Sequence, residues 1–182
     1  VLNLGMNDRV AEALANQTDD PEFAWDSYQR FVEMYAEVVL GVDRTQQLRP
    51  IRERVLAEQG LAADAPSSAS VAGQVIAAYK AAVLALTGRD FPDDPREQLL
   101  AAICAVYDSS YSERAVTYRQ INGIAPTVIS AVNVVTMIFG NLGDASATGV
   151  VFTRDPLTGE KILNGEYLTR APVSYTHLTL PT

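Results

Sequence analysis

Residues 148–163 read Thr-Gly-Val-Val-Phe-Thr-Arg-Asp-Pro-Leu-Thr-Gly-Glu-Lys-Ile-Leu, and this stretch decides how the C-terminal third of the chain can fold. Its first apolar segment, 150–153, has the β-branched and aromatic composition of a strand. Residues 155–159 combine Asp, Pro and Gly, which are turn formers. The turn leads to a second segment, Glu-Lys-Ile-Leu at 160–163. The pattern therefore predicts a β-hairpin whose strands are 150–153 and 160–163.

A loop of small residues leads into this hairpin. Residues 140–149 read Gly-Asn-Leu-Gly-Asp-Ala-Ser-Ala-Thr-Gly, and backbone N–H groups in such a loop can converge on an anion. Thr148 would add a hydroxyl donor. Composition leaves two interpretations open, a phosphate-binding loop and the commoner plain connection. The preceding segment, 130–139, is β-branched and apolar except for Asn133 and Thr136, which predicts a largely buried strand.

The first hundred residues carry helix signals instead. Asp20-Pro21-Glu22 supplies an N-cap, a proline at the first helical position and an acid in the first turn, and Asp94-Pro95-Arg96-Glu97 repeats the signal. Apolar spacing and glycine stops predict five helices: from Asn7 or Asp8 to Asn16, from Pro21 towards Gly41, from Pro50 to Gln59, from a cap at Ser70 towards Gly88, and from Pro95 to about Tyr111.

The second of these helices carries an aromatic stripe, typical of a core-facing helix. For residues 115–119 the pattern does not decide between a short strand and a continued helix. A helical block followed by a mainly β block predicts the α+β class.

Composition is that of a globular protein, with 48% apolar and 20% charged residues. The net charge of −8 argues against general nucleic-acid binding, which needs clustered Lys and Arg. We expect no membrane span, since no apolar stretch approaches the roughly 20 residues that a span requires, and a cytoplasmic address is the default. Cys104 is the only cysteine and lies in an apolar helical run, which predicts a small buried side chain.

Motifs that carry chemistry are scarce. Neither Gly-x-x-x-x-Gly-Lys-Ser/Thr nor Gly-x-Gly-x-x-Gly occurs, so the two common glycine-rich nucleotide fingerprints do not apply. His177 is the only histidine and has no cysteine nearby, so the sequence lacks the ligands of a zinc site. No spacing marks two carboxylates as an acid–base pair. The residues therefore predict neither a catalytic group nor a metal ligand within this chain.

Two blocks of the chain resemble the ATP-binding domain of pyruvate, phosphate dikinases. Residues 130–141 are similar to the "T-A-V-N-V-Q-x-M-V-F-G-N" of that family, and residues 148–160 resemble its "T-G-V-A-F-T-R-D-P-x-T-G-E". Upstream, residues 1–8 resemble "L-N-L-G-L-N-D" and residues 23–31 resemble "F-A-Y-D-S-Y-R-R-F". The matches are collinear from residue 1 to about 171.

The resemblance implies an ATP-grasp-like nucleotide-binding domain, incomplete here, with a helical-bundle insertion. It implies ATP and Mg²⁺ as ligands, with Thr148 and Gly149 approaching the polyphosphate. The family transfers the β-phosphoryl group of ATP to a histidine on a swivelling domain and then to pyruvate on a barrel. The parent protein is expected to be a homodimer, and this chain alone is expected to be inactive.

The same resemblance suggests four regions. Residues 1–20 would enter the ATP-binding domain, 21–112 would form the helical insertion, 113–170 would be the β-rich ATP-grasp-like part, and 171–182 would be a non-native tail. His177, in that tail, lacks the family's catalytic context. Val135 replaces a Gln that most members carry as a nucleotide contact, and Ile129 replaces a usual Gly.

Three alternatives remain at this level. A phosphoenolpyruvate synthase and a related drug- or glucan-phosphorylating dikinase share the domain, but the block at residues 23–31 favours the pyruvate, phosphate enzyme. A non-catalytic nucleotide-binding relic would also account for Val135.

Overall fold

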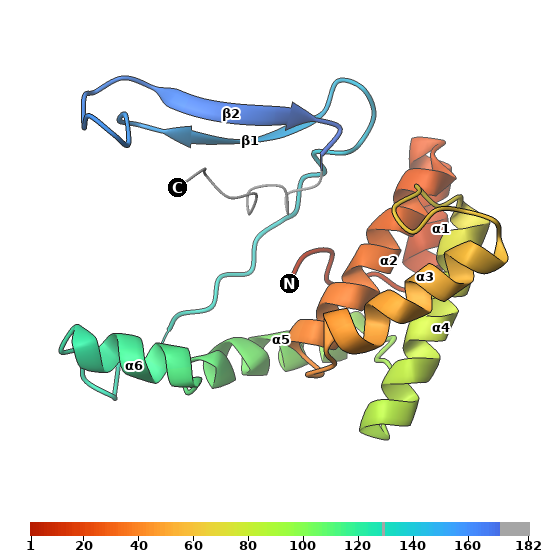
Figure 1. Ribbon diagram of the computed structural model, residues 1–182, viewed down its shortest axis with the longest axis horizontal. Coiled ribbons are helices and arrows are strands. Elements are labelled where there is room, and N and C mark those ends of the chain that lie inside the picture. Colours follow the sequence, from red (N-terminus) through yellow and green to blue (C-terminus); the bar gives the residue numbers. More distant parts are fainter. Residues whose placement is uncertain (129, 172–182) are drawn as a thin grey trace. The chain divides into compact units, whose positions relative to one another are not determined.

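The computed structural model describes residues 1–128 and 130–171 (Figure 1). The chain forms two compact units, Val1–Val135 and a second that begins at Thr136, and each is considered by itself. The predicted tail after Ala171, including His177, lies outside the described residues, as does Ile129.

The first unit is helical. Its elements in chain order are α1 (Asp8–Thr18), α2 (Pro21–Val38), the π-helical turn η1 (Arg44–Leu48), α3 (Arg49–Glu58), α4 (Ala69–Thr87), α5 (Pro95–Ser109) and α6 (Glu113–Ile121). All five predicted helices are therefore confirmed, and α6 shows that residues 115–119 are helical.

Side-chain caps account for where most of these helices begin. Asn7 Oδ1 accepts a hydrogen bond from Val10 N at 2.9 Å, and Asp20 Oδ1 accepts one from Phe23 N at 2.9 Å. Each bond satisfies an N–H that the first turn of a helix leaves without a partner. The cap predicted at Ser70 is wrong, because α4 begins two residues earlier and Ser68 is its N-cap.

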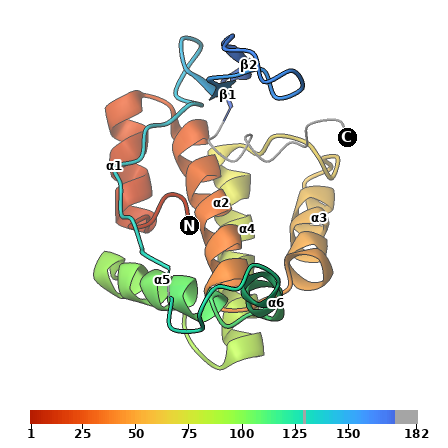
Figure 2. The same ribbon diagram turned by 90° about the vertical axis from the view of Figure 1, so that its left-hand side faces the viewer.

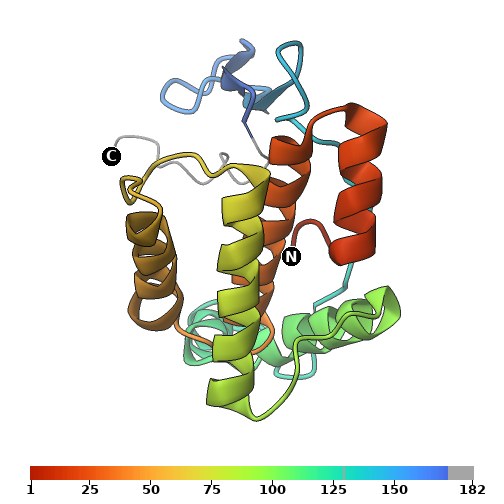
Figure 3. The ribbon, with the colours of Figure 1, turned by 90° about the vertical axis from the view of Figure 1, so that its right-hand side faces the viewer.

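The core of this unit lies between α2 and α4, which run side by side in Figures 2 and 3. The aromatic stripe of α2 is confirmed as core, since Phe31 and Tyr35 are almost completely buried. Phe91, from the segment before α5, meets the Tyr35 ring edge-on with 5.2 Å between centroids. Edge-to-face packing of this kind adds to the free energy gained by burial.

Three tyrosines, Tyr28, Tyr35 and Tyr79, are fully buried in this core, and we call them the buried tyrosines. Burial, helped by the charge of Glu97, raises the pKa of Tyr35 to about 12. Burial also raises the pKa of Tyr28, with Asp8 adding to the effect, and the pKa of Tyr79, with Glu33 adding to it. Each tyrosine hydroxyl therefore stays protonated in the folded chain well above the pH at which a free tyrosine ionises.

Helix α4 corrects the expectation that no apolar segment reaches spanning length. Within the described residues, α4 is the one helix that is long and apolar enough to cross a membrane by length and composition. Its inward residues Val75, Tyr79 and Val83 are completely buried against the rest of the helical core. Core packing accounts for these inward apolar residues, whereas Leu84 and Leu86 are about half exposed.

A buried glutamine ties the N-terminal segment to α5. Gln98 is completely buried, and its Nε2 donates to Met6 O at 3.0 Å and to Pro92 O at 2.9 Å. Its Oε1 accepts from Gly5 N at 2.9 Å. One side chain therefore satisfies two adjacent backbone groups near the N-terminus and a third just before α5.

Beyond this anchor, α5 and α6 run nearly end to end with much of their surface open (Figure 1). Leu100 is 64% exposed and Tyr111 is 70% exposed. The prediction that Cys104 is buried is wrong, since its thiol is exposed. The apolar sequence around Cys104 is typical of a buried helix. However, α5 contacts the core only through its first turns, where Gln98 and Ala102 are buried.

The second unit contains one antiparallel hairpin of β1 (Ala147–Phe152) and β2 (Asn164–Thr169). The predicted hairpin is confirmed, but its second strand is not 160–163. Asp155 N donates to Glu160 O and Gly159 N donates to Asp155 O, both at 2.9 Å, so the turn occupies this part of the chain. Pairing starts with Phe152 opposite Asn164.

The strand predicted at 130–139 is absent from the described residues of that segment. The composition suits a strand, but a strand also needs a hydrogen-bonded neighbour, and the sheet contains β1 and β2 alone. The expected burial is also wrong, because Val135 is 81% exposed and Ile138 is 82% exposed. A helical unit plus a small antiparallel sheet still confirms the α+β class.

Candidate functional site

The predicted phosphate loop ends at Thr148, whose surroundings are crowded. The Thr148 hydroxyl donates to Ala171 O at 2.7 Å. A Cβ on Gly140 would lie 1.9 Å from the Thr148 hydroxyl oxygen and 2.5 Å from Ala171 O. Only glycine at position 140 leaves room for this hydrogen bond. The structure thus brings together Gly140, Thr148 and Ala171, of which sequence reasoning had singled out Thr148.

Gly149 lies in β1 opposite Tyr167 of β2. A Cβ at this position would approach Glu166 O to 2.6 Å and Tyr167 Cβ to 2.9 Å, closer than real Cβ atoms come. Gly165, opposite Val151, is equally confined, since its Cβ would lie 2.3 Å from Val150 O. Two glycines facing the opposite strand therefore let the hairpin close in this register.

The loop from Gly140 to Ser146 is held by its own backbone. Gly143 has φ +74°, in the left-handed region that favours glycine, and Ser146 N donates to Gly143 O at 3.2 Å. Arg170 N donates to Ser146 O at 2.8 Å, which ties the loop to the end of β2. An ion pair of 2.9 Å between Arg170 Nη1 and Asp144 Oδ1 lies at the same place, with both side chains largely exposed. Such a pair contributes about 0 to 1 kcal/mol to stability.

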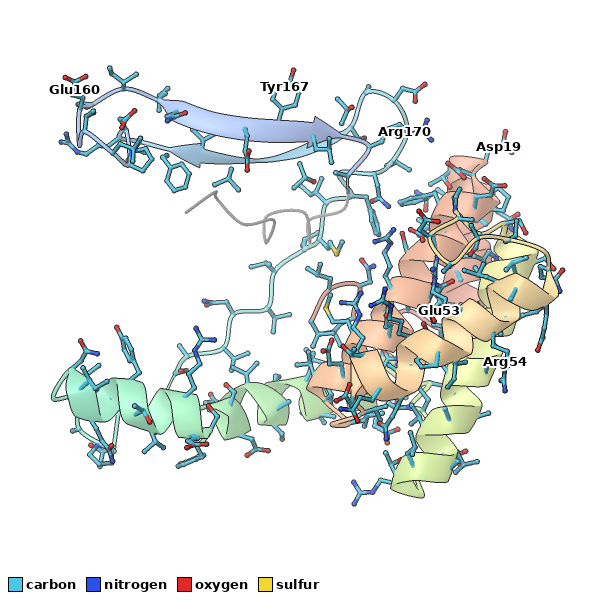
Figure 4. The ribbon with its side chains drawn as sticks, in the orientation of Figure 1. Asp19, Glu53, Arg54, Glu160, Tyr167 and Arg170 are labelled. Atoms are coloured by element: carbon cyan, nitrogen blue, oxygen red, sulfur yellow. The ribbon has the colours of Figure 1, made fainter. Side chains whose placement is uncertain are left out.

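Figure 4 shows Arg170 at the end of β2 and Tyr167 projecting from the same strand. Glu160 lies at the far end of the hairpin, in the turn that Asp155 organises. Asp155 Oδ1 accepts from Thr158 N at 2.9 Å and from Leu157 N at 2.8 Å. These hydrogen bonds lower the pKa of the Asp155 carboxyl, first through Thr158 and then through Leu157. They account for the Asp-Pro-x-Thr-Gly sequence of the turn without a ligand.

Other residue types offer little further chemistry. Among the described residues, no three His, Cys, Asp or Glu side chains gather closely enough to hold a metal ion. Val135, at the position of the expected Gln contact, is 81% exposed and apolar. The functional hypothesis therefore depends on the Gly140–Gly149 loop and on Thr148 in particular.

Comparison with known protein sequences identifies the family of this chain. The sequence model of the family described as "Pyruvate phosphate dikinase, AMP/ATP-binding domain" matches residues 2–171. The chain belongs to this family. Ala171, whose carbonyl oxygen binds Thr148, is the last residue of the match to the dikinase domain.

Curated dikinases agree over almost the same residues. The chain is 48% identical over 171 residues to the pyruvate, phosphate dikinase of Rhizobium meliloti (strain 1021), which covers 94% of this chain and 19% of that protein. It is 42% identical over 172 residues to that of Clostridium symbiosum, covering 94% of this chain and 20% of the relative. The chloroplastic pyruvate, phosphate dikinase 1 of Arabidopsis thaliana is 44% identical over 171 residues, which cover 94% of this chain and 18% of that protein. The chain thus spans about a fifth of the length of these dikinases.

Proposed function

We propose that the chain supplies ATP-binding elements to a pyruvate, phosphate dikinase, which converts ATP, pyruvate and phosphate to AMP, phosphoenolpyruvate and diphosphate. The family match over residues 2–171 carries this proposal. A phosphohistidine on a swivelling domain and a pyruvate-binding barrel would belong to the parent protein outside these residues. The chain alone would therefore bind nucleotide without turnover.

The fold suits an ATP-grasp-like role in part. Residues 21–112 of the helical unit would be the insertion of the nucleotide-binding domain, and the hairpin would be one edge of its sheet. Exposed side chains on the hairpin support this assignment, since Val151 is 68% exposed and Tyr167 is 75% exposed. An open sheet edge with apolar side chains needs further strands to cover it.

Thr148 and Gly149 would contact the polyphosphate. Thr148 has one hydroxyl proton and donates it to Ala171 O, so binding a phosphate oxygen would require the hydroxyl to leave that partner. Gly149 presents no side chain, which leaves its backbone open to a close approach. Positioning and charge stabilisation carry most of the catalysis in phosphoryl transfer.

Magnesium is the expected companion of ATP in the parent enzyme. The described residues contain no cluster of metal-binding side chains, so we assign no magnesium ligand to them and derive no step through the ion. We further propose a homodimeric, cytoplasmic parent protein, with no nucleic-acid partner.

A titration of the 182-residue chain with ATP and Mg²⁺, followed by ¹H–¹⁵N NMR, tests the nucleotide site. We expect saturable shifts in the amides of residues 140–149, about tenfold weaker binding by Thr148→Val, and unchanged binding by Thr153→Val. Thr153 is an exposed threonine just beyond β1 and serves as the matched control. Saturable shifts that avoid residues 140–149 would contradict the assignment.

The activity of the parent needs a separate test. The complete gene should encode a protein that forms AMP from ATP only when both pyruvate and phosphate are supplied. AMP formation from ATP and pyruvate without phosphate would instead indicate a phosphoenolpyruvate synthase.

A further inference from the structure

Gly140 begins the loop of residues 140–149, here called the nucleotide loop, and its backbone torsions do not explain why it is glycine. In the described part of the chain the glycines with positive φ include Gly143 and Gly159, at +74° and +75°, but not Gly140. At those two positions a Cβ would meet nothing within 4 Å, so glycine serves the torsion alone. Gly140 has the opposite requirement, which is space for its neighbours.

Three oxygen atoms occupy the space beside Gly140. A Cβ built there would overlap the Thr148 hydroxyl oxygen and would lie 2.5 Å from Ala171 O and 3.1 Å from Ala147 O. The first two are the donor and the acceptor of one hydrogen bond, which is 2.7 Å long. A methyl group at position 140 would therefore take the place of this hydrogen bond.

The hairpin holds the two carbonyl oxygens where they are. Ala147 begins β1 and is paired with the opposite strand. Arg170 N donates to Ser146 O at 2.8 Å, which keeps the residue before Ala171 against the loop. The side chain of Thr148 is the part that can move, so a methyl group at position 140 would drive it out of its present rotamer.

The present position of the Thr148 oxygen serves two alternative acceptors. In the free chain the single hydroxyl proton is donated to Ala171 O. Rotation about the Cβ–Oγ1 bond would direct the same proton to a phosphate oxygen without moving the hydroxyl oxygen. Threonine is β-branched and stiff at χ1, so the oxygen stays where packing places it. Thr148 is half-buried, which leaves the residue open to a ligand.

We propose that Gly140 is a positioning residue for the nucleotide loop. By placing no side chain in this space, it keeps the Thr148 hydroxyl where it bonds Ala171 O in the free chain and a phosphate oxygen when ATP is bound. The inference rests on the proposed contact between Thr148 and the polyphosphate. Gly140 acts only through Thr148 and touches no ligand with a side chain of its own.

The first measurement is the ATP affinity of the 182-residue chain, from NMR titrations with ATP and Mg²⁺. Gly140→Ala and Thr148→Val should each weaken binding about tenfold. Both changes remove the same hydroxyl from the same place. The double variant should therefore also bind about tenfold more weakly, whereas independent effects would multiply to about a hundredfold. Thr148→Ser keeps a hydroxyl and should stay within about threefold of the wild type.

The second measurement needs no nucleotide. The ¹³C shift of the Ala171 carbonyl reports whether it accepts a hydrogen bond. This shift should change in the same direction in Gly140→Ala and Thr148→Val and should stay near the wild-type value in Thr148→Ser. A merely structural glycine would not produce this pattern.

Gly73→Ala is the matched control for adding a methyl group. Gly73 lies inside α4, and its Cβ would make an ordinary 3.7 Å contact with Trp25. This variant should leave both the carbonyl shift and the ATP affinity unchanged. Cross-strand NOEs between Gly149 and Tyr167, which are paired in the hairpin, should persist in Gly140→Ala and show that the hairpin still forms.

The outcomes separate this inference from the proposed function. An unchanged Ala171 carbonyl shift in Gly140→Ala, wild-type ATP affinity of that variant, or multiplied effects in the double variant would each overturn the positioning role. If the wild-type chain gives no saturable shifts with ATP, the nucleotide assignment fails together with the ATP-bound half of the proposal. The carbonyl shift then still decides whether Gly140 places the Thr148 hydroxyl.

Discussion

Replacing Gln98 with leucine should destabilise the helical unit strongly although it keeps the side-chain volume nearly constant. The wild-type side chain makes three hydrogen bonds of 2.9 to 3.0 Å, to Gly5 N, Met6 O and Pro92 O. Each contributes about 1 kcal/mol, and leucine would leave the backbone partners unpaired. We expect a loss of about 3 kcal/mol in the free energy of unfolding, roughly a hundredfold change in the folded-to-unfolded ratio.

Urea unfolding followed by tryptophan fluorescence measures this loss. Trp25 is the only tryptophan, and it lies on α2 with its ring centroid 6.0 Å from that of Tyr28 in the core. With a slope of about 1.5 to 2 kcal/mol per molar urea, the midpoint should fall by about 1.5 to 2 M. Gln17→Leu, at an exposed position of α1, is the control and should change the midpoint little. Equal midpoints for the two variants would refute the assigned role of Gln98.

Three further predictions follow from the same structure. Gly149→Ala should abolish the cross-strand NOEs of the hairpin, because its Cβ would lie 2.6 Å from Glu166 O, whereas Val151→Ala, at an exposed site, should preserve them. The contribution of the buried tyrosines to stability should be constant below about pH 10 and should fall above it, since the unfolded chain releases tyrosine protons there while Tyr35 retains its own to about pH 12. The fall should approach about 1.4 kcal/mol per pH unit for each of the buried tyrosines, so Tyr35→Phe should make the measured slope shallower. Limited proteolysis should leave a resistant core from the helical unit, because the hairpin lacks a packed face, and a resistant core made of the hairpin instead would show that this inference is wrong.

The local signals in the sequence determined most helix positions. The caps at Asn7, Asp20 and Asp94 act within two or three residues of themselves, so their effect can be read without knowing the fold. The aromatic stripe of α2 has the same property, because its spacing alone places the rings on one face. The turn at Asp155 is equally local.

The sequence also determined the family, because motifs in a fixed order can be recognised without any knowledge of contacts. The match over residues 2–171 confirmed that resemblance. It did not determine the chemistry of Thr148, since a threonine in a small-residue loop is compatible with both a ligand contact and an internal hydrogen bond.

Only the tertiary structure decided which groups became buried and paired. Gln98 and Gln29 are polar helix residues with no special local signal, yet one holds three backbone groups and the other lacks a partner for its buried oxygen. Segment 130–139 has strand composition but no neighbouring strand among the described residues, and Cys104 has a core-like sequence context but remains exposed. Propensity and capping depend on a few adjacent residues, whereas burial and strand pairing depend on which segments, distant in sequence, pack next to a given residue.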